Sequence, residues 1–434
     1  GFMAARTDVD IRVARDKPRG TVVLRGARII TMKGTEVIPS GDIVVVDDRI
    51  SAVGPSGKVT IPAGARTIDV AGKTIIPGFI DIHAHMWPPQ GVHKSQVPQY
   101  YQNLAWGVTT IEDVQTSTSD VITYADREAA GDLLGPRSLS TGPGVFSRDS
   151  ITSLEEARDH VRRYSKEFFN TQRLKEYMAG DRRTRQYVIA ATREFGLTPT
   201  TEGAGDFKMS LSEFIDGYSG HEHAYEIYPL YADVAKLATI SGLTYTPTLI
   251  IAYGGPTGRD YWFTRESPHD DAKVRRFYYH PELDNRVLRR SMWGRDDQYV
   301  FWGVAEAANR IVKEGGKTGL GSHGEFQGLG AHWELWMYQM GGMSNFNVLR
   351  VATIFGADAL GLGKQLGSLE PGKFADLLVL DKNPLDNIRN TNSIRSVMKN
   401  GRLYDGNTLD EIWPRTKKAG PFWWSDYDPP PISK

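Results

Sequence analysis

Short apolar runs separated by glycine turns occur at both ends of the chain. Residues 20–76 contain several such runs, and the same pattern returns at residues 374–380, 394–398 and 402–404. Runs of about four to eight residues that are rich in Val, Ile and Thr and bounded by glycine are typical of strands. We therefore predict that the termini, residues 1–78 and 367–434, form one composite β-sandwich around a central domain of residues 79–366.

The central part alternates between strand-like and helix-like patterns, which is typical of a parallel sheet. Ser153 and Glu156 form a predicted capping box, and the apolar residues that follow it recur with helical spacing as far as Phe168. Residues 182–195 and 231–240 are also predicted helices. Eight strand candidates begin with the run before His83 and continue at 108–111, 138–140, 174–177, 197–201, 218–224, 244–251 and 318–321.

Eight strand–helix units predict an α/β fold of the (β/α)8 TIM-barrel type, in which catalytic residues lie at the C-terminal strand ends. An open doubly wound sheet is the alternative, but the chain has no Gly-rich phosphate fingerprint to support it.

Residues 253–298 form a connection that is too long for a simple turn and is rich in aromatic and charged residues. Long connections are usually functional, so a lid or substrate wall is one interpretation and a partly helical surface excursion is the other. The candidate substrate contacts are Tyr253, Arg259, Tyr261 and Trp262. The aromatic tail at 420–424 is predicted to pack on the domain or on another subunit, and a homo-oligomer is expected.

The charge balance favours small-molecule or short-peptide chemistry. The chain of 434 residues has 52 Lys and Arg against 52 Asp and Glu, with a pI near 7.3, which argues against nucleic acid or a membrane surface as partner. No apolar run approaches the ~20 residues of a membrane span, and no signal-peptide core begins the chain. Cytoplasmic and periplasmic or secreted locations therefore both stay open. Without cysteine, a metal ion would be held by His, carboxylate or modified Lys.

A predicted core strand ends in two histidines. The stretch 77–85 begins with a Pro-Gly turn and ends in His83-Ala84-His85. The period of a strand puts both imidazoles on one face, and neutral imidazole is a common zinc ligand. Further residues of ligand type lie on or after later strand candidates: Lys175, Glu202, His221, His223 and His323. Each alone has an ordinary structural explanation, but together, at the same end of five strands, they indicate a site.

Three motifs carry a family resemblance. The stretch 77–85, the run Gly107-Val108-Thr109-Thr110 and residues 366–377 resemble the amidohydrolase superfamily of metal-dependent hydrolases, with similarity over about residues 22–404. The resemblance implies a (β/α)8 barrel with a composite β-sandwich. Residues 25–34 and 328–334 are similar to the branch fused behind TolB-type β-propellers, so an N-terminal propeller in a longer protein is an expected partner.

The resemblance also implies roles for individual residues. It makes His83 and His85 first-strand metal ligands, and it makes Lys175 a candidate for carboxylation by CO2, which would turn a cation into a bridging carboxylate. His223 matches the sixth-strand ligand, and His221 is its competitor.

The chain departs from the family pattern in two places. Glu202 stands where the family commonly has histidine after the fifth strand, and Gly321-Ser322-His323 stands where it commonly has Gly-Thr-Asp. Carboxylate can replace imidazole as a ligand. His323 is a candidate ligand or general base, and Glu202 and Glu325 are the alternative bases. The predicted supporting residues are Asp81, which could orient a ligand imidazole, His332 and Glu334.

The leading hypothesis is hydrolysis of an amide, peptide or cyclic C–N bond by metal-activated water, with prolidase- or dipeptidase-like cleavage as one form of it. One or two divalent ions are expected, zinc first, with manganese or iron as alternatives. A second hypothesis is a metal-dependent lyase or isomerase in which His323 moves a proton. A third is a catalytically silent binding or assembly module fused to a propeller.

Overall fold

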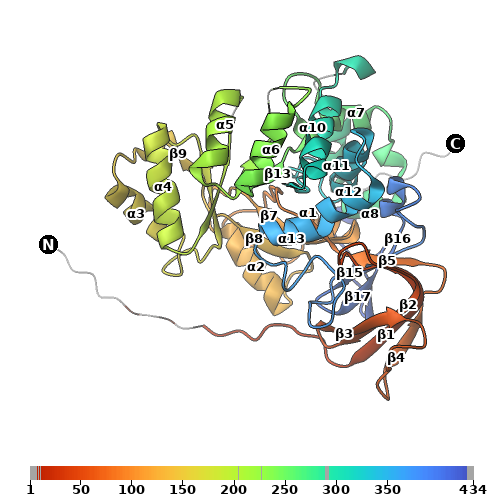
Figure 1. Cartoon of the computed structure of the whole chain (residues 1–434). Helices are drawn as coiled ribbons and strands as arrows, with labels where there is room; N and C mark the ends of the chain where they lie inside the picture. The colour runs from red at the N-terminus through yellow and green to blue at the C-terminus, as the bar shows by residue number, and fades with distance from the viewer. Residues whose placement is uncertain are drawn as a thin grey trace.

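The computed structural model describes residues 7, 9, 11–203, 205–225, 227–288 and 293–427. Figure 1 shows a body of parallel strands covered by helices and, next to it, a sheet in which strands from both ends of the chain lie side by side.

Strands from both termini form one sheet. Its order is β18-β17-β16-β15-β5-β1-β2-β3, with β4 on β1, and most of its pairs are antiparallel. The termini are joined where β5 pairs with β15, with Ile76 opposite Leu378. The bounds are β1 Thr21–Ile30, β2 Val37–Val46, β3 Arg49–Pro55, β4 Arg66–Asp69, β5 Thr74–Pro77, β15 Leu377–Leu380, β16 Ile394–Lys399, β17 Arg402–Asp405 and β18 Glu411–Trp413. The prediction that the two ends build one β unit is confirmed, and β5 and β18 are strands that the pattern did not predict.

The central strands are all parallel and close into a ring. Two parallel sheets, β6-β7-β8 and β9 to β14, are joined by a bridge between Asp81 and Leu320, and β8 and β9 are the other edge strands of these two sheets. The bounds are β6 Phe79–Asp81, β7 Val108–Asp113, β8 Arg137–Ser140, β9 Val145–Phe146, β10 Arg173–Tyr177, β11 Thr198–Glu202, β12 Gly220–Glu222, β13 Thr244–Thr246 and β14 Lys317–Thr318. The predicted TIM-type barrel is confirmed, although the run 244–251 is a strand only at its start.

Helices follow the strands around the ring. Ser153 caps α3 by accepting from the backbone N–H of Glu156, as the capping box predicts. The predicted apolar face does not reach Phe168, which is 73% exposed, because α3 ends at Arg162. The helices are α1 Pro98–Ala105, α2 Asp120–Ala130, α3 Leu154–Arg162, α4 Arg182–Glu194, α5 Phe207–Asp216, α6 Ala232–Ser241, α10 Phe301–Lys313, α11 Leu329–Met340, α12 Asn345–Arg350, α13 Gly356–Ala359, the π-helix η5 Val351–Phe355 and the short turns η1 Ser147–Asp149, η2 Leu249–Ile251 and η6 Ile388–Asn392.

The long connection between β13 and β14 is largely helical. It contains α7 Gly258–Phe263, η3 Pro268–Asp270, α8 Ala272–Phe277, α9 His280–Val287 and η4 Asp296–Gln298. The C-terminal turn η7 Trp423–Tyr427 packs beside it, since the buried Trp424 donates its indole N–H to the carbonyl of Arg276 at 2.9 Å. The aromatic tail therefore packs on its own domain.

The predicted domain boundaries at 78/79 and 366/367 stay predictions. The first falls between β5 and β6. Gly78 is required at this crossing, because a Cβ there would collide with the side chain of Thr109. Among the described residues, no helix is both long enough and apolar enough to cross a membrane.

Candidate active site

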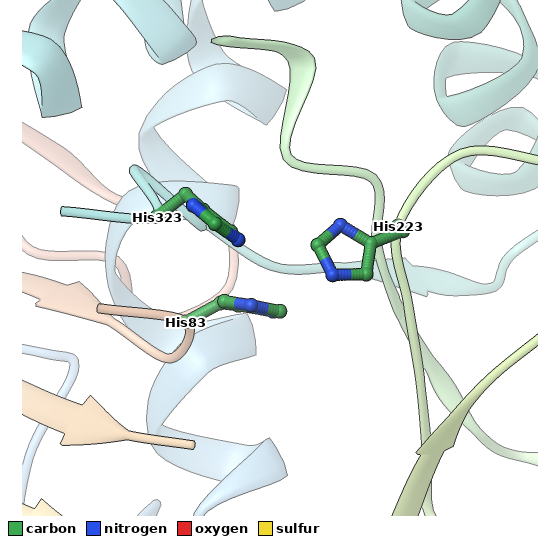
Figure 2. A group of neighbouring side chains, drawn as sticks. All are labelled: His83, His223 and His323. Atoms are coloured by element: carbon green, nitrogen blue, oxygen red, sulfur yellow. The ribbon is translucent and has the colours of Figure 1, made fainter. Parts of the chain in front are cut away.

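Histidines from three separate strands converge at the C-terminal end of the barrel. His83 follows β6, His223 follows β12 and His323 follows β14, and Figure 2 shows their rings gathered around a common point. The ring centroids lie 4.8 Å apart for His83 and His223, and 5.2 Å apart for His83 and His323. One nitrogen from each of the three lies within 4.8 Å of the others. His85 lies beside them, 4.6 Å from His323 between ring centroids.

Two of these histidines have unusual backbone conformations. His223 has φ of 69° and His323 has φ of 58°, in the left-handed region that residues other than glycine seldom adopt. The backbone turn at His223 ends the alternation of side chains along β12. His221 lies outside the cluster, where its Nε2 is 3.2 Å from the carboxylate of Glu213. The structure thus brings His223, and not His221, to the other candidate ligands.

A carboxylate holds the imidazole of His83. Nδ1 of His83 lies 2.6 Å from Glu222, while its Nε2 is buried without a hydrogen-bond partner. Glu222 also accepts from the hydroxyl of Thr200 at 2.5 Å and lies 4.0 Å from Arg173. Burial and the neighbouring cations and imidazoles lower the pKa of His83 well below its ordinary value, so its ring is neutral. The sequence interpretation missed Glu222, although its place between two candidate ligands was a usable signal.

The arrangement of His83 fits a metal ligand. A ligating histidine commonly donates one ring N–H to a carboxylate and offers the other nitrogen to the ion. Two buried imidazole nitrogens of the cluster lack a hydrogen-bond partner: His83 Nε2 and His85 Nδ1. Buried polar atoms are nearly always satisfied, so a set of unsatisfied atoms on the predicted ligands supports a site for a cation.

Lys175 and Glu202 lie side by side next to His223. Nζ of the fully buried Lys175 is 3.1 Å from Oε2 of Glu202, which is also 3.2 Å from Nε2 of His223. Burial acts to raise the pKa of Glu202, but the cation of Lys175 and the hydrogen bond with His223 outweigh it and hold that pKa far below its usual range. Glu202 is therefore ionised, and in this state it is a weak base.

Comparisons with known proteins show what this chain is similar to. Residues 295–404 match a family model described as the amidohydrolase family. Adenine deaminase of Paracoccus denitrificans is 31% identical over 105 residues, which are 23% of this chain and 16% of that protein. The 5-methylthioadenosine/S-adenosylhomocysteine deaminase of Symbiobacterium thermophilum is 22% identical over 403 residues, with 83% and 85% of the two chains covered. A solved Xaa-Pro dipeptidase with bound methionine in its active site shares the fold, with a TM-score of 0.67 at 20% identity over 89% of this chain and 100% of that one.

The matched segment and the relatives, together with the fold, support a member of the amidohydrolase superfamily. The chain spans only 16% and 13% of the length of two of its curated relatives, both adenine deaminases, so their whole activities are not transferred to it.

The histidine after the eighth barrel strand has its own carboxylate partner. Nδ1 of His323 is 3.3 Å from Glu325, to which Arg259 donates a hydrogen bond. Arg286 donates to the backbone carbonyl of Glu325 at 2.6 Å. Burial acts to raise the pKa of Glu325, but His323 and Arg259 outweigh burial and hold this pKa below its ordinary value. Arg259, a predicted substrate contact, and Glu325, a predicted base, are thus placed as partners that orient His323.

The predicted aromatic contacts separate into two groups. Tyr253 is half exposed, its ring lies 5.4 Å from that of His223, and it lines a cavity of about 380 Å³ beside the cluster. Trp262 is only 1% exposed and stacks on Trp333, and Tyr261 packs against Phe301. Tyr261 and Trp262 thus pack among the aromatic side chains of the long connection, and the substrate contacts predicted for them stay predictions. The lining of the cavity is Glu202, Gly205, Ala224, Tyr225, Tyr228, Tyr253 and Gly254.

The predicted supporting residues hold backbone segments rather than imidazoles. Asp81 accepts from the backbone N–H of His83 at 3.1 Å and of Ser322 at 3.2 Å, and burial raises its pKa to about 6. Glu334 accepts from two N–H groups of η2, at 2.8 and 2.9 Å. His332 lies 2.9 Å from the carbonyl of Trp106. These contacts tie the segments that carry the site to their neighbours.

Proposed function

We propose that this protein is a metal-dependent hydrolase of C–N bonds that acts on a small amide, peptide or cyclic substrate. The observation that carries the proposal is the three-histidine group, in which His83 and His223 are buried and Glu222 holds one nitrogen of His83 and leaves the other open. The names of its relatives, two deaminases and a Xaa-Pro dipeptidase, denote reactions at C–N bonds.

His83, His223 and His323 would hold the ion, and three imidazoles with an open position are a ligand set of catalytic zinc sites. Manganese or iron are the alternatives. When bound, such an ion polarises a carbonyl and lowers the pKa of water. Burial lowers the pKa values of His83 and His85 well below the ordinary value, which keeps both rings in the neutral form that can bind a cation. Glu222 fixes the tautomer of His83, and Glu325 orients His323.

The state of Lys175 sets the number of ions. As an ammonium group paired with Glu202 at 3.1 Å, Lys175 neutralises the carboxylate and leaves the three-histidine group as a site for one ion. Carboxylation of Lys175 would replace that cation by an anion next to Glu202 and favour a second ion. We propose that the unmodified ion pair gives a one-ion site. Metal content measured with and without bicarbonate tests this: an additional equivalent that appears only with bicarbonate and is lost in Lys175→Ala would overturn it.

The cavity beside the cluster limits the substrate. Its volume of about 380 Å³ and its tyrosine lining suit a compact substrate with an apolar or aromatic group. We therefore propose a dipeptide or acyl amide of this kind, with prolidase-like cleavage as the first reaction to test. The predicted homo-oligomer and N-terminal propeller stay predictions.

The test is amine release from a panel of Xaa-Pro dipeptides and N-acyl amino acids by protein reconstituted with zinc or manganese. Oxygen-18 from labelled water should enter the carboxylate product, whereas a lyase or isomerase would give unlabelled product. Activity should vanish in the double variant of His83→Ala and His85→Ala. A matched control is His93→Gln, since His93 pairs with Asp120 at 2.5 Å outside the cluster. Full activity in the double variant would refute the proposal.

The same assay defines the role of His323. As a ligand, His323 should be needed for metal binding, so His323→Gln should lose the ion and the activity together. His323→Asp introduces a carboxylate ligand and should retain the ion. If His323→Gln keeps its metal but loses turnover, the ligand assignment is wrong and His323 transfers a proton instead.

A further inference from the structure

A second group of metal-binding side chains lies in the helical connection between β13 and β14. His269 is on η3, and His280 and Asp284 are on α9, one turn apart on the same helical face. Nε2 of His269 lies 2.8 Å from Oδ1 of Asp284, and Nε2 of His280 lies 3.3 Å from the same oxygen. One ligand atom from each of the three lies within 4.8 Å of the others.

The group is held in place by its surroundings. Leu283 and Val287, on the same helix as His280, are buried in the main core, as is Phe277 at the end of α8. The rings of His269 and His280 meet edge to face at 5.7 Å. His280 and Asp284 therefore lie on a helix fixed by packing, and Pro268, next to His269 on η3, is also buried, so little ordering cost would oppose ligand binding.

The arrangement differs from an ordinary histidine–aspartate pair. His93 contacts Asp120 in such a pair, and no further donor appears there among the described metal-binding groups. At α9, two imidazoles direct their Nε2 atoms at a single carboxylate oxygen. A set of two imidazoles and one carboxylate is a common ligand set for zinc.

We infer that His269, His280 and Asp284 form a second divalent-metal site, of zinc type, that is separate from the barrel mouth. The side chain of Asp284 is 40% exposed and those of His269 and His280 are 26% and 18% exposed, so solvent can fill the fourth position. A bound ion would tie η3 to α9 across α8, and its role is to fix this connection.

Helix α9 links this site to the barrel mouth. Arg286, on α9, donates to the backbone carbonyl of Glu325 at 2.6 Å and is paired with Glu282 at 3.0 Å. Glu325 in turn lies 3.3 Å from His323. An ion that fixes the first turn of α9 therefore also steadies the segment that carries His323, without touching the substrate.

Zinc content of the whole protein at buffered free zinc tests the site. We expect His269→Gln, His280→Gln and Asp284→Asn each to bind one equivalent less than the parent protein, and His93→Gln to bind as much. Asp284→Asn changes the charge with little change in shape, so it keeps the test valid if a histidine variant fails to fold. Equal zinc content in all of these proteins would overturn the inference.

Two further measurements locate the ion. Anomalous scattering from crystals soaked in zinc should give a peak bounded by His269, His280 and Asp284, and the absence of a peak there would contradict the site. Added zinc should slow amide hydrogen exchange several-fold in peptides covering residues 268–287 of the parent protein but not of His280→Gln. Equal slowing in both proteins would assign the effect to the barrel mouth.

Discussion

The barrel mouth and the connection between β13 and β14 both gather histidines, but they do so by different means. At the mouth, the fully buried His83 and its partners come from strands far apart in the sequence, and a second layer of charged groups supports them. In the connection, the partners come from neighbouring helical turns, and Asp284 is 40% exposed. A buried site depends on its supporting network, whereas a half-exposed site depends mainly on its own ligands. The predictions below test this difference.

Removal of the buried guanidinium of Arg173 should have the largest effect. Arg173 pairs with Glu112 and lies near Glu222, and all three side chains are at most 3% exposed. Breaking a buried ion pair leaves an uncompensated charge and costs about 3–5 kcal/mol. We expect Arg173→Ala to lower the free energy of unfolding in urea by about this amount. The matched variant Lys317→Ala, in the exposed pair with Asp358, should cost about 0–1 kcal/mol. Equal losses of unfolding free energy in the two variants would show that the buried network at the mouth stabilises the protein no more than an exposed ion pair does.

Glu222→Gln should weaken metal binding at the mouth while the protein remains folded. The glutamine keeps the shape of the side chain but loses the carboxylate charge. In the parent protein this carboxylate lies 2.6 Å from Nδ1 of His83. Loss of such an outer partner lowers metal affinity about 10- to 100-fold. Competition with a zinc chelator measures this shift. The zinc equivalent assigned to His269, His280 and Asp284 should be unchanged, and a loss at both sites would contradict their independence.

Strands such as β7 and β15 could be predicted from the sequence because their residues are buried along the whole strand. The strand before His83 and His85 brings them to the barrel mouth, but β6 ends at Asp81, so the predicted strand period does not extend to the two histidines. That same period could not separate His221 from His223, since the left-handed turn at His223 depends on the surrounding chain. Aromatic content alone also could not distinguish a substrate wall from a core, and Trp262 is core.

The buried carboxyl groups of the barrel should make stability fall as the pH rises. Burial raises the pKa of Asp81 to about 6 and that of Asp113 to about 7, so the folded protein holds protons that the unfolded chain has released. Their contribution is complete below about pH 4 and is lost as the pH rises toward 7. In chelator-treated protein, Asp113→Asn should flatten this dependence by at most about 1.4 kcal/mol per pH unit.

Urea unfolding at several pH values between 4 and 8 measures this dependence. The matched control is Asp159→Asn, because Asp159 is 71% exposed on α3. An unchanged slope in Asp113→Asn would show that this carboxyl is not held protonated by burial.

The smallest effect is expected at the two tyrosines whose predicted roles the structure separates. Tyr253 lines the cavity beside His223, whereas Tyr261 packs in the aromatic core of the connection. An aromatic contact contributes about 0.5–1.5 kcal/mol, so Tyr253→Ala should raise KM roughly two- to tenfold with little change in kcat. Tyr261→Phe should leave both constants unchanged. Tyr253→Phe separates ring from hydroxyl, since it should keep the parent KM if the ring makes the contact. If KM rises in Tyr261→Phe but not in Tyr253→Ala, the substrate binds at the helical connection and not at the cavity beside His223.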